Sequence, residues 1–211
     1  MNRLTEQFFQ NPTGVFAFPE VSAALDASPF SRHGLVKRAL AGGEILNIRR
    51  GLYCLAPRYQ KRPVNPFALA ERIYGPSYIS METALRHHDW IPEAVHVCTC
   101  ASYGNAKEFN TPLGVFSYSR VPQRIFYAGV ERRVEPDGNV FFMASPAKAL
   151  ADYFYVRRPP WKSIRDASGS LRIEEEEIHA VDADELSLLE ENYTNRRVRH
   201  FLAGWREALR P

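Results

Sequence analysis

Residues 28–55 read SPFSRHGLVKRALAGGEILNIRRGLYCL, and this stretch decides the fold expected for the front of the chain. Ser28 offers a side-chain cap, and Pro29 after it has a fixed φ and no N–H group, which suits the first position of a helix. Gly42-Gly43 supplies the left-handed backbone at which helices commonly end. We therefore expect a helix between these two signals, with Leu35, Val36, Ala39 and Leu40 on its apolar face.

A β-hairpin is predicted directly after this helix. Two β-prone runs, 45–48 and 52–55, flank Arg49-Arg50-Gly51, so two arginines should lie at the hairpin tip. Upstream, short helices are expected over about 2–10 and 19–26, and about two residues separate the second helix from the third. Residues 1–62 are accordingly predicted to form a winged helix-turn-helix domain.

Residues 63–211 are predicted to form a second domain, reached through a proline-punctuated linker. Caps and hydrophobic patterning predict its elements. Helices are expected over 67–74, 80–88 and 145–157, and strands over 94–100, 114–120, 128–134 and 139–143. Residues 159–180 are interpreted as a mobile connection, and 184–209 as one final helix. The predicted fold class is α+β, with a mainly antiparallel sheet and a C-terminal helix.

Charge is unevenly distributed along this chain of 211 residues with a net charge of +3. Residues 1–62 contain nine Lys/Arg and four Asp/Glu, whereas residues 161–211 contain eight and eleven. A polyanion-binding surface is therefore expected at the front of the chain. No apolar run is long enough to span a bilayer, and the start lacks a signal-peptide pattern, so a cytoplasmic protein without membrane contact is expected. The three cysteines are interpreted as thiols.

Three stretches, in this order and spacing, resemble the AbiEi-type antitoxin family of transcriptional regulators. They are Gly34–Arg38 with Ile48–Tyr53, Ser77–Leu85, and Ala144–Asp152. The resemblance covers roughly residues 13–156. It implies a winged-helix domain that binds inverted repeats in the operon's own promoter, and a second domain that neutralises a nucleotidyltransferase toxin. Inverted repeats call for two copies, bound as a dimer or as cooperating monomers.

The candidate DNA-binding residues lie on the third helix and at the hairpin tip. They are Ser31, Arg32, His33, Lys37, Arg38, Arg49 and Arg50. The helix is expected to read base edges in the major groove, and the tip to contact phosphates or a minor groove. Arg32 and His33 lie nearer the apolar face and could instead serve packing within the domain.

Other residue patterns give weaker indications of metal binding or catalysis. His96, Cys98 and Cys100 alternate along one predicted strand, but a single strand cannot easily surround a metal ion, so no metal or other cofactor is predicted. No phosphate loop, nucleophile elbow or metalloprotease helix is present, so no catalytic residue is predicted. The alternatives are a winged-helix adaptor that binds protein, and a nucleic-acid-processing enzyme. Aromatic side chains are interpreted as core and interface rather than base-stacking surfaces: Phe116, Tyr118, Phe126, Tyr127, Phe141, Phe142, Tyr153, Phe154 and Tyr155.

Overall fold

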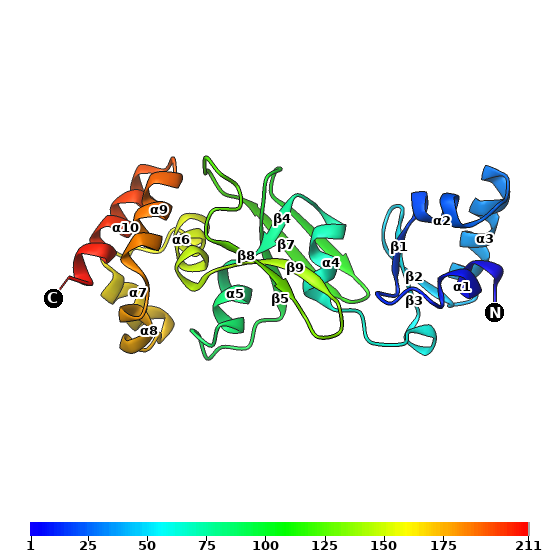
Figure 1. The fold of residues 1–211 in the computed structure, drawn as a ribbon, viewed down its shortest axis with the longest axis horizontal. Helices are drawn as coiled ribbons and strands as arrows, with labels where there is room; N and C mark the ends of the chain where they lie inside the picture. The colour runs from blue at the N-terminus through cyan, green and yellow to red at the C-terminus, as the bar shows by residue number, and fades with distance from the viewer. Residues whose placement is uncertain (211) are drawn as a thin grey trace.

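The computed structural model describes residues 1–210. The chain has a mixed α+β fold, 44% helical and 21% strand, which confirms the predicted class. Its elements follow one another along an elongated molecule, so that the helices at the two ends of the chain lie at opposite ends of the long axis (Figure 1). No helix among residues 1–210 has the length and apolar character needed to cross a membrane.

The N-terminal part contains three helices and a small antiparallel sheet with the strand order β1-β3-β2. Its elements are α1 Arg3–Phe8, β1 Val15–Ala17, α2 Phe18–Ala24, α3 Pro29–Ala41, β2 Ile45–Arg49, β3 Leu52–Leu55 and a short 3-10 helix, Pro57–Tyr59. The expected helix and hairpin of residues 28–55 are both present. The small strand β1 was not predicted, because three residues become a strand only by pairing with β3.

Local chemistry accounts for the bounds of α3. The Ser28 hydroxyl accepts a hydrogen bond from the Ser31 backbone N–H at 3.2 Å, and Pro29 is the first helical residue. After the helix, Gly43 adopts a φ of +61°, a left-handed conformation that strains residues with a side chain. Both predicted signals therefore act as expected, and they set the first and last residues of α3.

The larger sheet occupies the centre of the molecule, with the strand order β6-β7-β5-β4-β9-β8. Its strands are β4 Ser77–Ile79, β5 Val97–Ser102, β6 Lys107–Thr111, β7 Gly114–Arg120, β8 Val130–Val134 and β9 Val140–Ala144. Two of the pairings, β4 with β9 and β5 with β7, are parallel. The sheet is therefore mixed: β7 lies between β5 and β6, and β9 pairs with β4, a strand distant from it in sequence.

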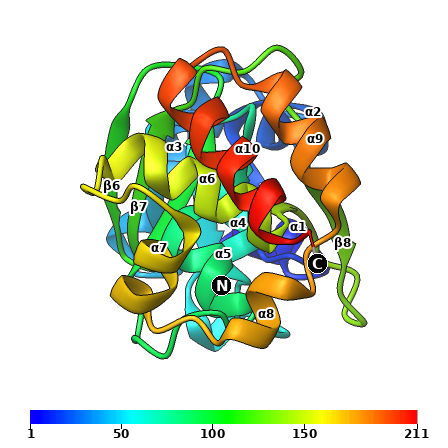
Figure 2. The same ribbon diagram turned by 90° about the vertical axis from the view of Figure 1, so that its left-hand side faces the viewer.

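Helices pack on both faces of this sheet. Helix α4 (Pro66–Ile73) lies on the face toward the N-terminal part, and α5 (Met81–His87) and α6 (Pro146–Arg157) lie on the other (Figure 1). Beyond α6 follow α7 (Ile164–Leu171), α8 (Glu175–His179), α9 (Ala183–Asn192) and α10 (Arg196–Ala208), which form the far end of the molecule (Figure 2).

Two expectations about the C-terminal region are wrong. Residues 159–180 are not a mobile connection, because they contain α7 and α8. Residues 184–209 are not one helix, because Tyr193 adopts an extended backbone, with ψ near 135°, and Asn195 caps a new helix. The Asn195 side chain accepts hydrogen bonds from the N–H groups of Arg197 and Val198 at 3.0 and 3.2 Å. Side-chain capping thus restarts the helix after the break.

The hydrophobic core has two clusters, and the larger one joins the two parts of the chain. The smaller cluster lies within residues 4–55, where Leu4, Phe16 and Leu55 are fully buried. The larger cluster fills the centre of the molecule and also includes Val15, Ile48, Leu52 and Cys54 from the small sheet. The small sheet therefore packs helices against one face and the body against the other.

Candidate nucleic-acid interface

Helix α3 leaves most of its surface uncovered, at the end of the molecule away from the body (Figure 1). Of its thirteen residues, only Val36 and Ala39 are fully buried. Its exposed residues include Phe30, Ser31, Lys37 and Arg38, and the Phe30 side chain is 90% exposed. The helix contains no carboxylate. It therefore presents a cationic face with a large apolar side chain at its N-terminal end.

Two of the predicted DNA-binding residues support the packing of α3. The Arg32 guanidinium is half-buried, and its Nε donates a hydrogen bond to the Leu25 carbonyl at the end of α2. His33 is exposed, and its ring lies 4.4 Å from the Phe18 ring while its Nδ1 lies 2.8 Å from the Pro29 carbonyl oxygen. Arg32 joins α2 to α3, as its place near the apolar face suggested, and it is committed to that contact.

The two arginines of the hairpin tip have different surroundings. Arg50 is exposed, whereas Arg49 is half-buried against the body. The Arg49 guanidinium donates to the Arg72 carbonyl at 3.0 Å and to the Arg50 carbonyl at 3.1 Å. The structure thus places Ser31, Lys37 and Arg38 on one exposed helix and leaves Arg50 free at the tip, while Arg49 holds the hairpin on α4.

Arg58 is a further cation near the C-terminal end of α3. Its guanidinium donates to the carbonyl groups of Gly42 and Gly43 at 3.0 and 3.2 Å, and it lies over the Tyr59 ring. Carbonyl groups at the end of a helix carry partial negative charge, which a cation neutralises. Arg58 therefore stabilises the end of α3 with its own donors.

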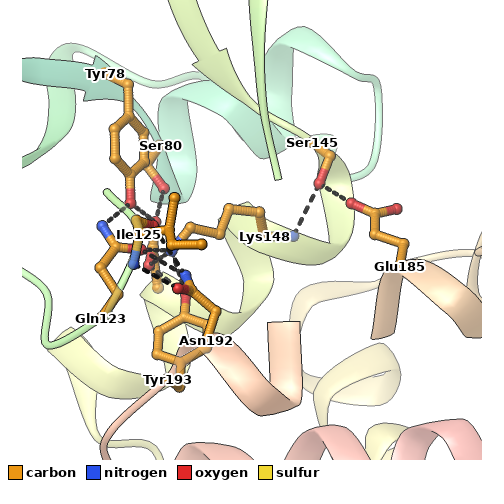
Figure 3. A network of polar contacts seen from close by, with 10 residues as sticks. Tyr78, Ser80, Gln123, Ile125, Ser145, Lys148, Glu185, Asn192 and Tyr193 are labelled. Atoms are coloured by element: carbon orange, nitrogen blue, oxygen red, sulfur yellow. Dashed lines mark hydrogen bonds and ion pairs between the residues drawn. The ribbon is translucent and has the colours of Figure 1, made fainter. Parts of the chain in front are cut away.

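A second polar cluster lies inside the body, where Lys148 and Asp152 are completely buried. Figure 3 shows Lys148 together with Tyr78, Gln123 and Tyr193. The Lys148 Nζ lies 2.8 Å from Asp152 Oδ1 and donates to Tyr193 Oη at 2.7 Å and to Gln123 Oε1 at 2.8 Å. On the other side, Asp152 Oδ2 accepts from the hydroxyl groups of Tyr78 and Ser80 at 3.1 and 2.7 Å. Each charge is thus matched by several partners, as buried ions require.

Electrostatics keeps the phenols of this cluster in their donor form. Burial raises the pKa of Tyr193 well above its usual range, and the neighbouring Asp152 carboxylate raises it further. Burial lowers the pKa of the Lys148 ammonium, and Asp152 opposes that effect. The cluster ties β4, α6 and the α9–α10 junction together through hydrogen bonds.

This cluster also explains two of the sequence stretches singled out above. Ser77–Leu85 contributes Tyr78 and Ser80, and Ala144–Asp152 contributes Lys148 and Asp152. The two stretches therefore meet in the interior through hydrogen bonds to one carboxylate. Most residues of both stretches are buried, so they contribute to the architecture of the body.

The cysteines and histidines of the described residues form no group that could hold a metal ion. The part of the chain that is described, residues 1–210, contains no group of three His, Cys, Asp or Glu side chains arranged to hold a metal ion. Cys54, Cys98 and Cys100 are free thiols. Burial raises the pKa of the Cys54 thiol to about 11, so this group stays protonated at neutral pH.

No protein-family model and no curated protein matches this chain. The features of this chain that bear on its function are the exposed face of α3, the hairpin tip and the charges around them.

Proposed function

We propose that this protein binds double-stranded DNA sequence-specifically, as a transcriptional regulator, through α3 and the β2–β3 hairpin. The order of its first elements, with α2 and α3 closely joined and a hairpin directly after α3, matches that of a winged helix-turn-helix. The observation that carries the proposal is the uncovered face of α3. A thirteen-residue helix that fully buries two residues has a surface available for the major groove.

The exposed side chains suit distinct parts of a duplex. Lys37 and Arg38 offer cationic donors to phosphates or guanine edges, and Ser31 offers a hydroxyl that contacts either. Phe30 supplies an apolar surface for a thymine methyl group. Arg50 is exposed at the hairpin tip, and we assign it to the neighbouring phosphates or minor groove. Arg32 and Arg49 act behind this surface, because their guanidinium groups bind carbonyl groups of the protein.

Charge favours DNA over a protein partner for this surface. Helix α3 carries Arg32, Lys37 and Arg38 and no acidic residue. Interfaces between proteins are depleted of lysine and mix both signs of charge at the rim, whereas DNA-binding surfaces are strongly basic. The winged-helix adaptor is thus the weaker alternative, and it predicts that duplex DNA is not bound.

The family resemblance extends the proposal to an antitoxin that represses its own operon and neutralises a nucleotidyltransferase toxin. This extension depends on the resemblance, since the matching stretches of the body lie in its interior. Co-expression with the product of an adjacent nucleotidyltransferase gene tests it. Restored growth of the host supports the antitoxin role, and unrelieved toxicity with a folded, full-length protein contradicts it.

A selection from a pool of random duplexes tests the DNA-binding proposal. The full-length protein is expected to enrich one short motif, arranged as an inverted repeat if two copies bind. The variant Lys37→Ala/Arg38→Ala should enrich none. A matched variant of two exposed arginines on the body, Arg132→Ala/Arg165→Ala, should enrich the same motif as the unaltered protein. Failure of the unaltered, folded protein to enrich any motif contradicts sequence-specific binding.

A further inference from the structure

A cavity of about 380 Å³ opens beside the connection between β7 and β8, on the body and far along the chain from α3. Its lining includes two exposed arginines, Arg120 and Arg124, and three aromatic side chains, Tyr103, Phe126 and Tyr155. No carboxylate lines it. Its volume falls within the range of small-molecule sites, about 300–1,000 Å³.

A second, smaller cavity of about 250 Å³ shares Tyr155 as a common wall. It adds Arg158 and Arg197 to the lining, again without a carboxylate. Arg197 is engaged, because it donates to the Pro159 carbonyl and its guanidinium lies 4.1 Å from the centre of the Phe154 ring. The two cavities together are therefore lined by four arginines and share Tyr155.

Three of these four arginines form no ion pair within the described residues. Within residues 1–210, the ion pairs made by arginines use Arg72, Arg86, Arg133, Arg157, Arg172 and Arg206. Arg120, Arg124 and Arg158 take part in none of them and are exposed. Arginine side chains that line a cavity and lack an acceptor within the protein suit phosphate oxygens, which a guanidinium group can bind in a bidentate way.

The floor of the larger cavity is rigid because it is anchored to the buried cluster (Figure 3). The Gln123 amide donates to Tyr78 Oη at 3.0 Å and accepts from Lys148 Nζ at 2.8 Å. The backbone N–H of Arg124 donates to the Asn192 carbonyl at 2.9 Å. The connection between β7 and β8 is thus held in place from below, and a preformed site loses little entropy when a ligand binds.

The aromatic side chains indicate that the ligand contains a base as well as a phosphate group. Tyr103 is 70% exposed, and its ring meets the Phe126 ring edge-on, with 5.8 Å between the ring centres. Phe126 and Tyr155 are half-buried and line the cavity. Exposed rings beside arginines are the combination that stacks on bases and binds the attached phosphates.

We infer that this pair of cavities binds a nucleotide, with the base against Tyr103, Phe126 or Tyr155 and the phosphates on Arg120, Arg124 and Arg158. The ligand is either a free nucleoside triphosphate or a nucleotide of a single-stranded nucleic acid, since both present a base and a phosphate. The site is separate from α3 and does not depend on the proposed DNA binding.

Isothermal titration calorimetry of the full-length protein tests this inference. The ligands are the four nucleoside triphosphates, a 5′-phosphorylated single-stranded trinucleotide and inorganic tripolyphosphate. We expect saturable binding of at least one nucleotide or the trinucleotide, with a Kd below about 1 mM. Tighter binding of the trinucleotide identifies a strand as the source, and tighter binding of a triphosphate identifies the free nucleotide. Absence of saturation by all of these nucleotides overturns the inference.

Variants separate the phosphate contacts from the base contacts. Arg120→Ala/Arg124→Ala should weaken binding at least about tenfold, and Arg132→Ala, an exposed arginine on β8, should leave it unchanged. Tyr103→Ala should weaken nucleotide binding about fivefold or more without altering any binding of tripolyphosphate. Equal affinity for tripolyphosphate and the nucleotide, or full binding by the Tyr103 variant and by Phe126→Leu, overturns the assignment of a base site. The variant Lys37→Ala/Arg38→Ala should bind the nucleotide normally.

Discussion

The Arg49 guanidinium donates a hydrogen bond to the backbone carbonyl of Arg72 at 3.0 Å, and this contact fastens the β2–β3 hairpin to the end of α4. Arg72 in turn donates to the Val15 carbonyl at 2.9 Å and forms an ion pair with Glu20. The N-terminal part thus donates a hydrogen bond to the body, and the body donates one to the N-terminal part. The orientation of the N-terminal part is therefore fixed by polar contacts as well as by the shared apolar core.

The two arginines of the hairpin tip should respond differently to substitution. Arg49→Ala removes the hydrogen bond to Arg72, at a cost of about 1 kcal/mol, and should lower Tm by about 2–4 °C. Arg50→Ala should leave Tm unchanged and weaken DNA binding, because Arg50 is exposed. Thermal denaturation and gel-shift titration of both variants check this. Equal loss of DNA affinity without loss of stability in the Arg49 variant contradicts the anchoring role.

Phe30 should contribute to binding without contributing to stability. Its side chain is 90% exposed, so Phe30→Ala should change the free energy of unfolding by less than about 0.5 kcal/mol. Burial of a phenylalanine in a complex is worth about 1.5–3 kcal/mol, so DNA affinity should fall about tenfold or more. Ile125→Ala, which removes an exposed apolar side chain of the body, is the control. If Phe30→Ala binds DNA with unchanged affinity, the N-terminal end of α3 does not contact the DNA.

The buried Lys148–Asp152 pair should be sensitive to removal of one partner. Lys148→Met leaves the Asp152 carboxylate without its cation and should cost about 3–5 kcal/mol in urea denaturation. Lys148→Met/Asp152→Leu should recover part of this loss, since no unpaired charge remains. The control is Arg86→Met, which breaks the exposed pair with Asp89 and should cost no more than about 1 kcal/mol. Similar costs for Lys148→Met and the control contradict the burial of the pair.

Glu185 should make stability depend on pH. Burial raises the pKa of this half-buried carboxyl above its ordinary value of 4.5, although it accepts a hydrogen bond from the Ser145 hydroxyl. Its ionisation therefore disfavours the folded state, and stability is lost as pH rises from about 4.5 through the folded pKa. Glu185→Gln should be more stable than the unaltered protein at pH 7 and equal to it near pH 3. A Tm difference that is the same at both pH values excludes this carboxyl as the cause.

Local signals made most of the N-terminal part predictable from the sequence. Ser28-Pro29 and Gly42-Gly43 mark the ends of α3 by capping and backbone geometry, which depend on neighbouring residues alone. The C-terminal region carried equivalent signals that the prediction missed. Ser163 and Asp166 form a capping box at the start of α7, and Asn195 caps α10. The acidic run that follows Ile173 starts α8 and leaves its glutamates exposed.

Features that depend on distant parts of the chain were not predictable. Lys148 and Asp152 are four residues apart on α6, a spacing typical of a surface ion pair, and only the packing of β4 and the α9–α10 junction buries them. Arg49 resembles Arg50 in sequence, and its commitment to the Arg72 carbonyl appears only when α4 packs beside the hairpin. The mixed order of the large sheet has the same origin, since β9 pairs with β4 across more than sixty residues of chain.

The salt dependence of DNA affinity tests the central claim most directly. With Arg49 and Arg58 bound to carbonyl groups, the free cations of the surface are Lys37, Arg38 and Arg50, so log K against log salt should have a slope of about −3. Lys37→Ala/Arg38→Ala should reduce this slope by about two, and Arg132→Ala/Arg165→Ala should leave it unchanged. An unchanged slope for the α3 variant, with its fold intact, contradicts binding of duplex phosphates by this helix.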